Sequence, residues 1–134
     1  MKLVTFTVDE ANQALKKIRP RIQRLVEAKR EFERLQTRIS VLGLATAGAT
    51  RDNPDAHELQ ALHEQRNRQA GEISQQMAAV HRHGCLVKDL ERGLVDFYAV
   101  AGDRLVFLCW QLGETEVGHW HTLEGGFGSR QPLH

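Results

Sequence analysis

Apolar residues recur every three or four positions along the first third of the chain. The series begins at Ala11, passes through Leu25 and ends at Leu42. This spacing is that of a single buried face on a helix. We therefore predict a long helix over residues 8–42.

Two local signals refine this helix. Thr7 is followed three residues later by Glu10, the pattern of a reciprocal capping box at a helix start. Pro20 lies inside the helix and removes one backbone hydrogen bond. Because the apolar series continues in phase on both sides, we expect a bend there and not a break.

A second helix follows a loop. The small and polar residues "GLATAGATRDN" predict a loop at 43–53. Asn53 followed by Pro54 is typical of a helix N-cap and first turn. A second apolar series then runs to Val80, and Gly84 is a candidate C-terminal cap. The two helices would form an antiparallel hairpin.

After Gly84 the apolar period changes from that of a helix to that of a strand. The segments "CLVKDL", "GLVDFYAV" and "RLVFLCWQL" predict three antiparallel strands. The last two flank "AGD", so we expect a tight turn at Gly102 and Asp103. Both faces of these strands carry apolar residues, which predicts a sheet covered on both sides.

The segment 114–124 permits two structures. On a strand, His119 and His121 share a face with Trp120 opposite, whereas a helix turns the two histidines apart. We favour a short helix, followed by a loop at "GGFGSRQP" that its glycines allow to bend.

Together these elements predict an α+β protein. Residues 1–84 form a long antiparallel two-helix hairpin, coiled-coil-like, and residues 85–134 form a small C-terminal antiparallel β module. At Leu25 and Val26 the apolar face is wider than a two-helix seam needs. We therefore expect the hairpin to pack on another copy, or its spare face to be covered by the β module.

Composition argues against a disordered chain and against a membrane-spanning protein. The chain has 134 residues, 41% hydrophobic and 26% charged, with a net charge of +1. This composition is typical of a folded soluble domain. No apolar run approaches the ~18 residues that span a bilayer, and we identify no signal peptide. Cys85 and Cys109 lack a C-x-x-C spacing, so we expect reduced thiols and a cytoplasmic protein.

The C-terminal half carries ligand types suited to a metal ion. They are Asp96, Cys109, Glu114, His119, His121 and Glu124. Their spacing matches no zinc motif. The metal-binding alternative uses Cys109, His121 and Glu124. The structural alternative is that His121 hydrogen-bonds a carboxylate or the backbone while Trp110 and Trp120 fill the core. We expect no cofactor.

Nucleophilic catalysis and anion binding are weaker candidates. Cys109 and His121 could pair as nucleophile and base, but "VFLCWQL" reads as a buried strand, where a thiol is inert. Arg130 beside the glycines of "GGFGSR" could hold an anion. We slightly favour an ion pair from Arg130 to Glu124 or Glu114 that fixes the tail.

The first helix is rich in basic residues. Between Lys16 and Arg38 nine basic residues face three acids, an excess that could contact nucleic-acid phosphates. The alternative is a solvated face with ion pairs such as Lys29–Glu33 and Glu31–Arg34, opposite acids on the second helix. Because no aromatic residues are interleaved, we do not favour nucleic acid.

Several segments resemble a known family. "FTVDEANQAL", "GCLVKDLERGLVDFYAV" and above all "CWQLGE…WH…GF..RQPL" are similar to the bacterial family known as domain of unknown function 2203. The resemblance implies a shared fold and a bacterial cytoplasmic setting, and it implies no reaction.

We therefore expect a non-enzymatic assembly or interaction protein that self-associates through its helices, without a membrane. Its recognition surface would lie on the C-terminal module, at Asp96, Trp110, Glu114, Trp120, His121 and Arg130. The alternatives are a small ligand- or metal-binding protein using Cys109, His121 and Glu124, and a nucleic-acid-associated helical protein.

Overall fold

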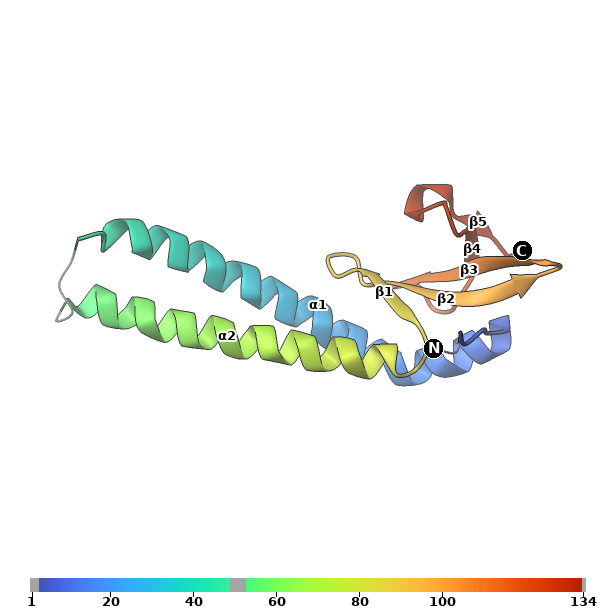
Figure 1. Ribbon diagram of the computed structural model, residues 1–134, viewed down its shortest axis with the longest axis horizontal. Helices are drawn as coiled ribbons and strands as arrows, with labels where there is room; N and C mark the ends of the chain where they lie inside the picture. The colour runs from blue at the N-terminus through green and yellow to red at the C-terminus, as the bar shows by residue number, and fades with distance from the viewer. Residues whose placement is uncertain (1–2, 49–52, 134) are drawn as a thin grey trace. The chain divides into compact units, whose positions relative to one another are not determined.

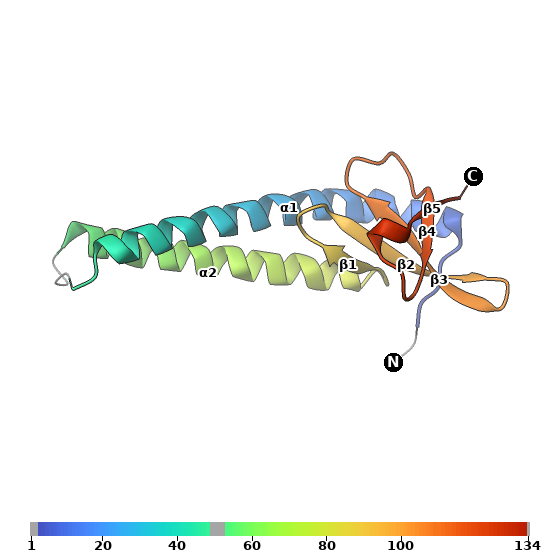
Figure 2. The ribbon, with the colours of Figure 1, turned by 90° about the horizontal axis from the view of Figure 1, so that it is seen from above.

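The computed structural model describes residues 3–48 and 53–133. It confirms the α+β architecture: two long helices joined by a short loop precede an antiparallel sheet (Figures 1 and 2). The helices are α1, Val8–Ala45, and α2, Pro54–His81. The strands are β1 Leu86–Asp89, β2 Leu94–Ala101, β3 Arg104–Gln111, β4 His119–Thr122 and β5 Gln131–Pro132, with a short 3₁₀ helix, η1 Phe127–Ser129, before β5.

Helix α1 begins at the expected capping box. The Thr7 backbone N–H donates to Glu10 Oε1 at 2.9 Å, and the Glu10 N–H donates to Thr7 Oγ1 at 3.1 Å. The helix is unbroken at Pro20, as predicted, and the bend expected there stays a prediction. It ends at Ala45 and not at Leu42, because a glycine such as Gly43 is tolerated inside a helix at a cost of only ~1 kcal/mol.

The loop is therefore shorter than the predicted range 43–53, since its first three positions are helical. Residues 49–52 of that range lie outside the described residues. Asn53 caps α2 as expected, its Oδ1 accepting the Asp55 N–H at 2.8 Å. Gly84, with φ at +89°, follows α2 in the left-handed conformation that closes helices.

The chain divides into two compact units, which are described separately: Met1–Val26 with Gln76–His134, and Glu27–Gln75. The second unit is a section of the helical hairpin. Its small core is formed by Leu35, Ile39 and Leu62, with Leu42 and Leu59 packed against it. A domain boundary at residue 84 remains a prediction.

Ion pairs occupy the charged surface of the second unit. Glu31 pairs with Arg34 at 2.8 Å, and Lys29 with Glu33 at 3.6 Å, both as predicted. Arg38 reaches Glu58 on α2 at 2.8 Å. Part of the basic excess of α1 is thus neutralised by acids on both helices.

The first unit contains a five-stranded sheet in the order β1-β2-β3-β4-β5, with every pair antiparallel. The prediction of three strands was too low, and the helix favoured within 114–124 was wrong. Residues His119–Thr122 instead pair with Val106–Cys109. A strand is favoured over a helix here because β4 pairs with backbone groups that β3 would otherwise leave unpaired at a sheet edge.

The two faces of the sheet differ in chemistry. One face carries the fully buried Phe97 and Trp110. The Arg19 guanidinium of α1 lies 5.8 Å from the centre of the Trp110 ring, which places α1 on this face. The opposite face, which we call the polar face, carries Asp96 and His121 beside the apolar Leu94 and Phe107. The segment that contains η1 lies over this face. In the first unit, the start of α1 and η1 lie on opposite sides of the sheet (Figure 1). Within the described residues, neither helix has the length and apolar content needed to cross a bilayer.

Candidate metal centre

Three potential metal ligands meet on the polar face of the sheet: Asp96 from β2, Cys109 from β3 and His121 from β4. Asp96 lies directly opposite Cys109, so their side chains leave the sheet on the same face. Cys109 lies opposite His119, and His121 is two residues further along β4, on that face as well.

The central strand explains why these side chains can meet. Strands β2 and β4 are separated by β3, or roughly 10 Å of sheet at ~4.8 Å per strand. Asp96 and His121 therefore reach each other above β3. Asp96 lies opposite Cys109 and His121 opposite Phe107, so the contact crosses β3 between these two residues. The Cys109 sulfur is the third member of the group.

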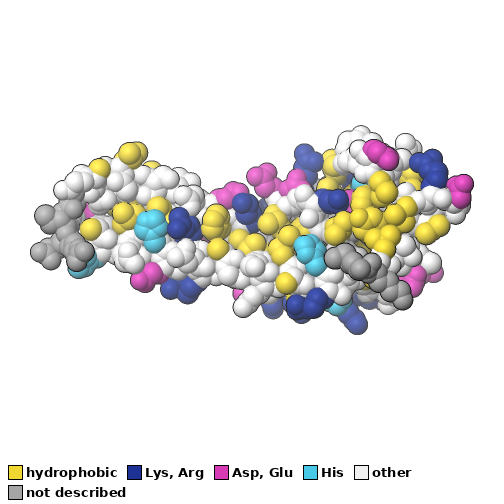
Figure 3. All heavy atoms as spheres, viewed as in Figure 1, with side chains coloured by type: hydrophobic (Ala, Val, Ile, Leu, Met, Phe, Trp, Pro, Cys, Tyr) yellow, Lys and Arg dark blue, Asp and Glu magenta, His cyan; other side chains and the backbone are white. Residues whose placement is uncertain are grey.

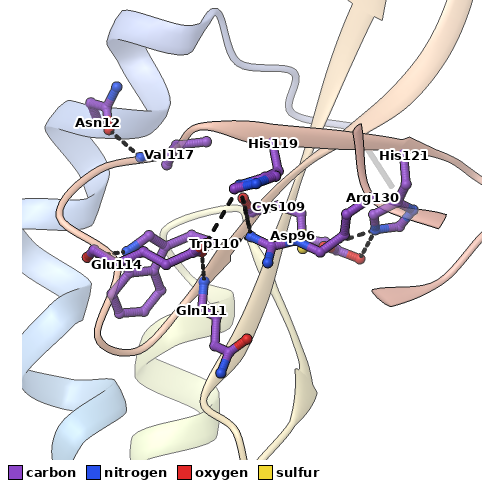
Figure 4. A network of polar contacts seen from close by, with 10 residues as sticks. All are labelled: Asn12, Asp96, Cys109, Trp110, Gln111, Glu114, Val117, His119, His121 and Arg130. Atoms are coloured by element: carbon purple, nitrogen blue, oxygen red, sulfur yellow. Dashed lines mark hydrogen bonds and ion pairs between the residues drawn. The ribbon is translucent and has the colours of Figure 1, made fainter. Parts of the chain in front are cut away.

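The geometry is compact and shielded from water. One ligand atom from each of the three residues lies within 4.8 Å of the others. Asp96, Cys109 and His121 are 2%, 0% and 3% exposed. His121 Nε2 is 3.1 Å from both carboxylate oxygens of Asp96 (Figure 4). Nitrogen and oxygen ligands of a tetrahedral zinc ion stand roughly 3.4 Å apart, so the separation of His121 Nε2 from the Asp96 oxygens is close to that of a ligand pair.

Hydrogen bonding sets the orientation of His121. Its Nδ1 is 2.7 Å from the Thr122 carbonyl oxygen, which can only accept, so Nδ1 carries the proton and donates. In a neutral imidazole, Nε2 then presents a lone pair to the Asp96 carboxylate, which also only accepts. A cation or a second proton must separate them. Metal-binding histidines are commonly held by such a bond from their other ring nitrogen.

Burial also affects both thiols. It raises the pKa of Cys109 from its ordinary value of 9.0 to about 12, with a further contribution from the neighbouring Asp96 and an opposing one from Arg130. The pKa of Cys85 is likewise raised to about 12 by burial. Without a bound cation Cys109 is a neutral thiol, which argues against a free thiolate nucleophile at this position.

A second polar cluster fixes the segment beside the three ligands. Arg130 Nη2 donates to Glu114 Oε1 at 2.6 Å and lies 3.2 Å from His119 Nδ1. Glu114 Oε1 also accepts the Gln111 backbone N–H at 2.7 Å. The Trp110 indole donates to the Glu114 carbonyl at 3.0 Å (Figure 4). Arg130 thus pairs with Glu114, one of the two acids expected, and ties the tail to the sheet.

The candidate residues are distributed as follows. Asp96 and His121 come together with Cys109, while Glu114 and Arg130 form the adjacent cluster. Trp110 is fully buried on the opposite face, and Trp120 alternates to that face as well. Asp96, Trp110 and His121 have almost no exposed surface, and a recognition surface that includes them stays a prediction.

The acidic ligand differs from the one assigned by sequence. Glu124 lies after β4 and is exposed, outside the group of three. Asp96 takes its place. The sequence did contain a signal for Asp96, which is a carboxylate in the middle of the apolar strand "GLVDFYAV". A two-residue turn joins this strand to the strand of Cys109.

Comparison with known proteins identifies a family and no function. Residues 4–133 match the family described as "Uncharacterized conserved protein (DUF2203)". Neither the curated proteins nor the solved structures contain a match.

Proposed function

Because the chain belongs to the DUF2203 family, whose description names no activity, we propose a function from the geometry of the site. The protein binds one divalent metal ion, zinc before others, through Asp96, Cys109 and His121. The observation that carries the proposal is the convergence of three different ligand types from three strands on one buried point.

The ligand set indicates the metal. Zinc accepts thiolate, imidazole and carboxylate ligands and adopts tetrahedral geometry without a preference from its d electrons. Three protein ligands leave its fourth position open, the arrangement that zinc uses to bind water or another small ligand. The bond from His121 Nδ1 to the Thr122 carbonyl leaves Nε2 free for the metal.

The competing interpretation is a buried ion pair between protonated His121 and Asp96, hydrogen-bonded to a neutral Cys109 thiol. It requires burying two charges for a stabilisation that is commonly small. It also predicts that zinc has no effect on the protein, so the two interpretations differ in a measurable way.

The test is a zinc titration of tag-free protein stripped with chelator, with a chromophoric competitor and thermal unfolding as readouts. We expect one zinc per chain and a raised Tm in the wild type. Asp96→Asn, Cys109→Ser and His121→Gln should each weaken zinc binding by roughly 100-fold or more.

Two variants serve as matched controls. His119→Gln removes the other histidine of β4, and Glu124→Gln removes the exposed acid; both should retain zinc. Circular dichroism of each metal-free variant establishes that it is folded. A folded wild type that takes up no zinc, or a His121→Gln variant that keeps it, would exclude the proposal.

A second candidate function, self-association through the helices, is favoured by the thin core of the hairpin. Among the described residues of 27–75, four are buried: Ala28, Leu35, Ile39 and Leu62. Val41 and Leu44 are 64% and 83% exposed. Val41 lines a cavity of about 270 Å³, and apolar side chains are visible between charged ones along this section (Figure 3). A second copy would cover this surface.

A further inference from the structure

A cavity of about 240 Å³ lies against the candidate metal centre. Asp96 and His121 form part of its wall, and Cys109 is not among its lining residues. An ion held by Asp96 and His121 would therefore border the cavity, through which a small ligand could approach it.

Two cations stand at this cavity. The Lys88 ammonium lies over the ring of Phe107, 4.7 Å from its centroid, and the Arg92 guanidinium lies over Phe127 at 4.5 Å. Both residues line the cavity. Aromatic rings hold cations in place without neutralising their charge, so both remain able to bind an anion.

Besides the candidate ligand Asp96, one acidic residue lines the cavity, and its carboxylate already accepts hydrogen bonds from the backbone. Asp89 also lines the cavity, but its Oδ1 accepts the backbone N–H groups of Glu91 and Arg92, at 2.8 and 3.2 Å. The charges of Asp96 and a metal-bound Cys109 thiolate would balance those of a divalent ion. With Lys88 and Arg92 against Asp89, the remaining charged residues of the lining carry a net charge of +1, so the cavity is electropositive once the metal is bound.

We propose that this cavity binds a small oxyanion, a carboxylate or phosphate group, which takes the open position on the metal and pairs with Lys88 and Arg92. The inference rests on the proposed metal binding and extends it to a ligand class. Apolar walls at Leu94, Leu123 and Phe127 suit a short hydrocarbon part beside the anionic group. The volume admits a small molecule and no polymer.

The experiment uses protein loaded with Co²⁺ in place of zinc, because the visible absorption of cobalt reports its coordination. Acetate, inorganic phosphate and acetamide are titrated separately. We expect a saturable spectral change with acetate or phosphate, and the more effective anion identifies the group. Neutral acetamide, which has the shape of acetate, should cause no change.

Variants separate recognition by the cavity from simple coordination to the metal. The double variant Lys88→Gln/Arg92→Gln should weaken anion binding roughly tenfold or more. Arg104→Gln, which removes an exposed cation at the start of β3 outside the cavity lining, should not. Anion binding that is equal in the double variant, or no spectral change with either anion, would overturn the inference. A protein that shows no cobalt spectrum before any anion is added would reject the metal site itself.

Discussion

Cys109 combines two properties that its position requires: a small side chain and a sulfur atom. A larger residue at position 109 would crowd the contact between Asp96 and His121, which crosses β3 between Cys109 and Phe107. A smaller one would leave the two without a third ligand. Identifying the candidate set from sequence needed the face of each side chain as well as its chemistry. Cys109 and His121 were recognised, but Glu124 was chosen over Asp96 because the fold of 114–124 was misjudged.

Cys85 offers a test of burial that does not involve the metal centre. Its Sγ lies 3.5 Å from the Val80 carbonyl, and burial raises its pKa to about 12. A raised pKa stabilises the fold below the unfolded value of 9.0, and this contribution is lost as pH rises from 9 towards 12. Between pH 8 and 10, metal-free wild type should lose roughly 1 kcal/mol more of its free energy of unfolding than Cys85→Ala. Urea unfolding at both pH values measures this, and equal losses would show that the thiol ionises freely.

The hairpin of β2 and β3 could be placed from sequence because its turn fixes which residues of the two strands lie opposite each other. Its two-residue turn at Gly102 and Asp103 was predicted from "AGD", and it pairs Ala101 with Arg104. Counting back along both strands then places Asp96 opposite Cys109. The short strands β4 and β5 could not be found in this way, because their apolar alternation is brief and their stability comes from pairing with β3 and with each other.

Two glycines in this unit provide a matched pair for testing the packing of the sheet on α1. Gly93 and Gly102 have φ values of +68° and +65°. A Cβ at Gly93 would lie 2.7 Å from Leu112 Cβ and 3.1 Å from Ile22 Cγ2, whereas a Cβ at Gly102 would meet nothing within 4 Å.

We expect Gly102→Ala to lower the free energy of unfolding by roughly 1–2 kcal/mol, from backbone strain alone. Gly93→Ala should lower it by roughly 2–4 kcal/mol, since overpacking adds to the same strain. Chemical denaturation of both variants gives the comparison. Equal losses would mean that Gly93 does not lie against α1 and Leu112.

For the molecule as a whole, the sequence predicted the class of fold, and the long helices were its most readable part. It did not predict that residues 8–26 of α1 form a compact unit with the sheet while 27–75 form another. An apolar face on a helix predicts that the face is buried, but it does not identify the element that covers it. Ile22, on the part of α1 that belongs to the sheet unit, is fully buried, whereas Leu44 at the far end is 83% exposed.

Self-association should depend on this far end of the hairpin. We expect size exclusion with light scattering to report a dimer or larger species at micromolar concentration. Val41→Glu/Leu44→Glu should convert it to a monomer with unchanged helicity, because both side chains are exposed in the single chain. Leu123→Glu, an exposed leucine on the sheet unit, is the control and should leave the mass unchanged. A wild type that stays monomeric would remove the second candidate function.

The metal centre is the central claim, and X-ray absorption at the zinc edge of the loaded, tag-free protein tests it most directly. We predict one sulfur ligand at about 2.3 Å, together with nitrogen and oxygen ligands at about 2.0–2.2 Å. The sulfur contribution should disappear in Cys109→Ser and persist in Cys85→Ser. A spectrum without sulfur in the wild type, or one whose sulfur depends on Cys85, would contradict the assignment of Asp96, Cys109 and His121.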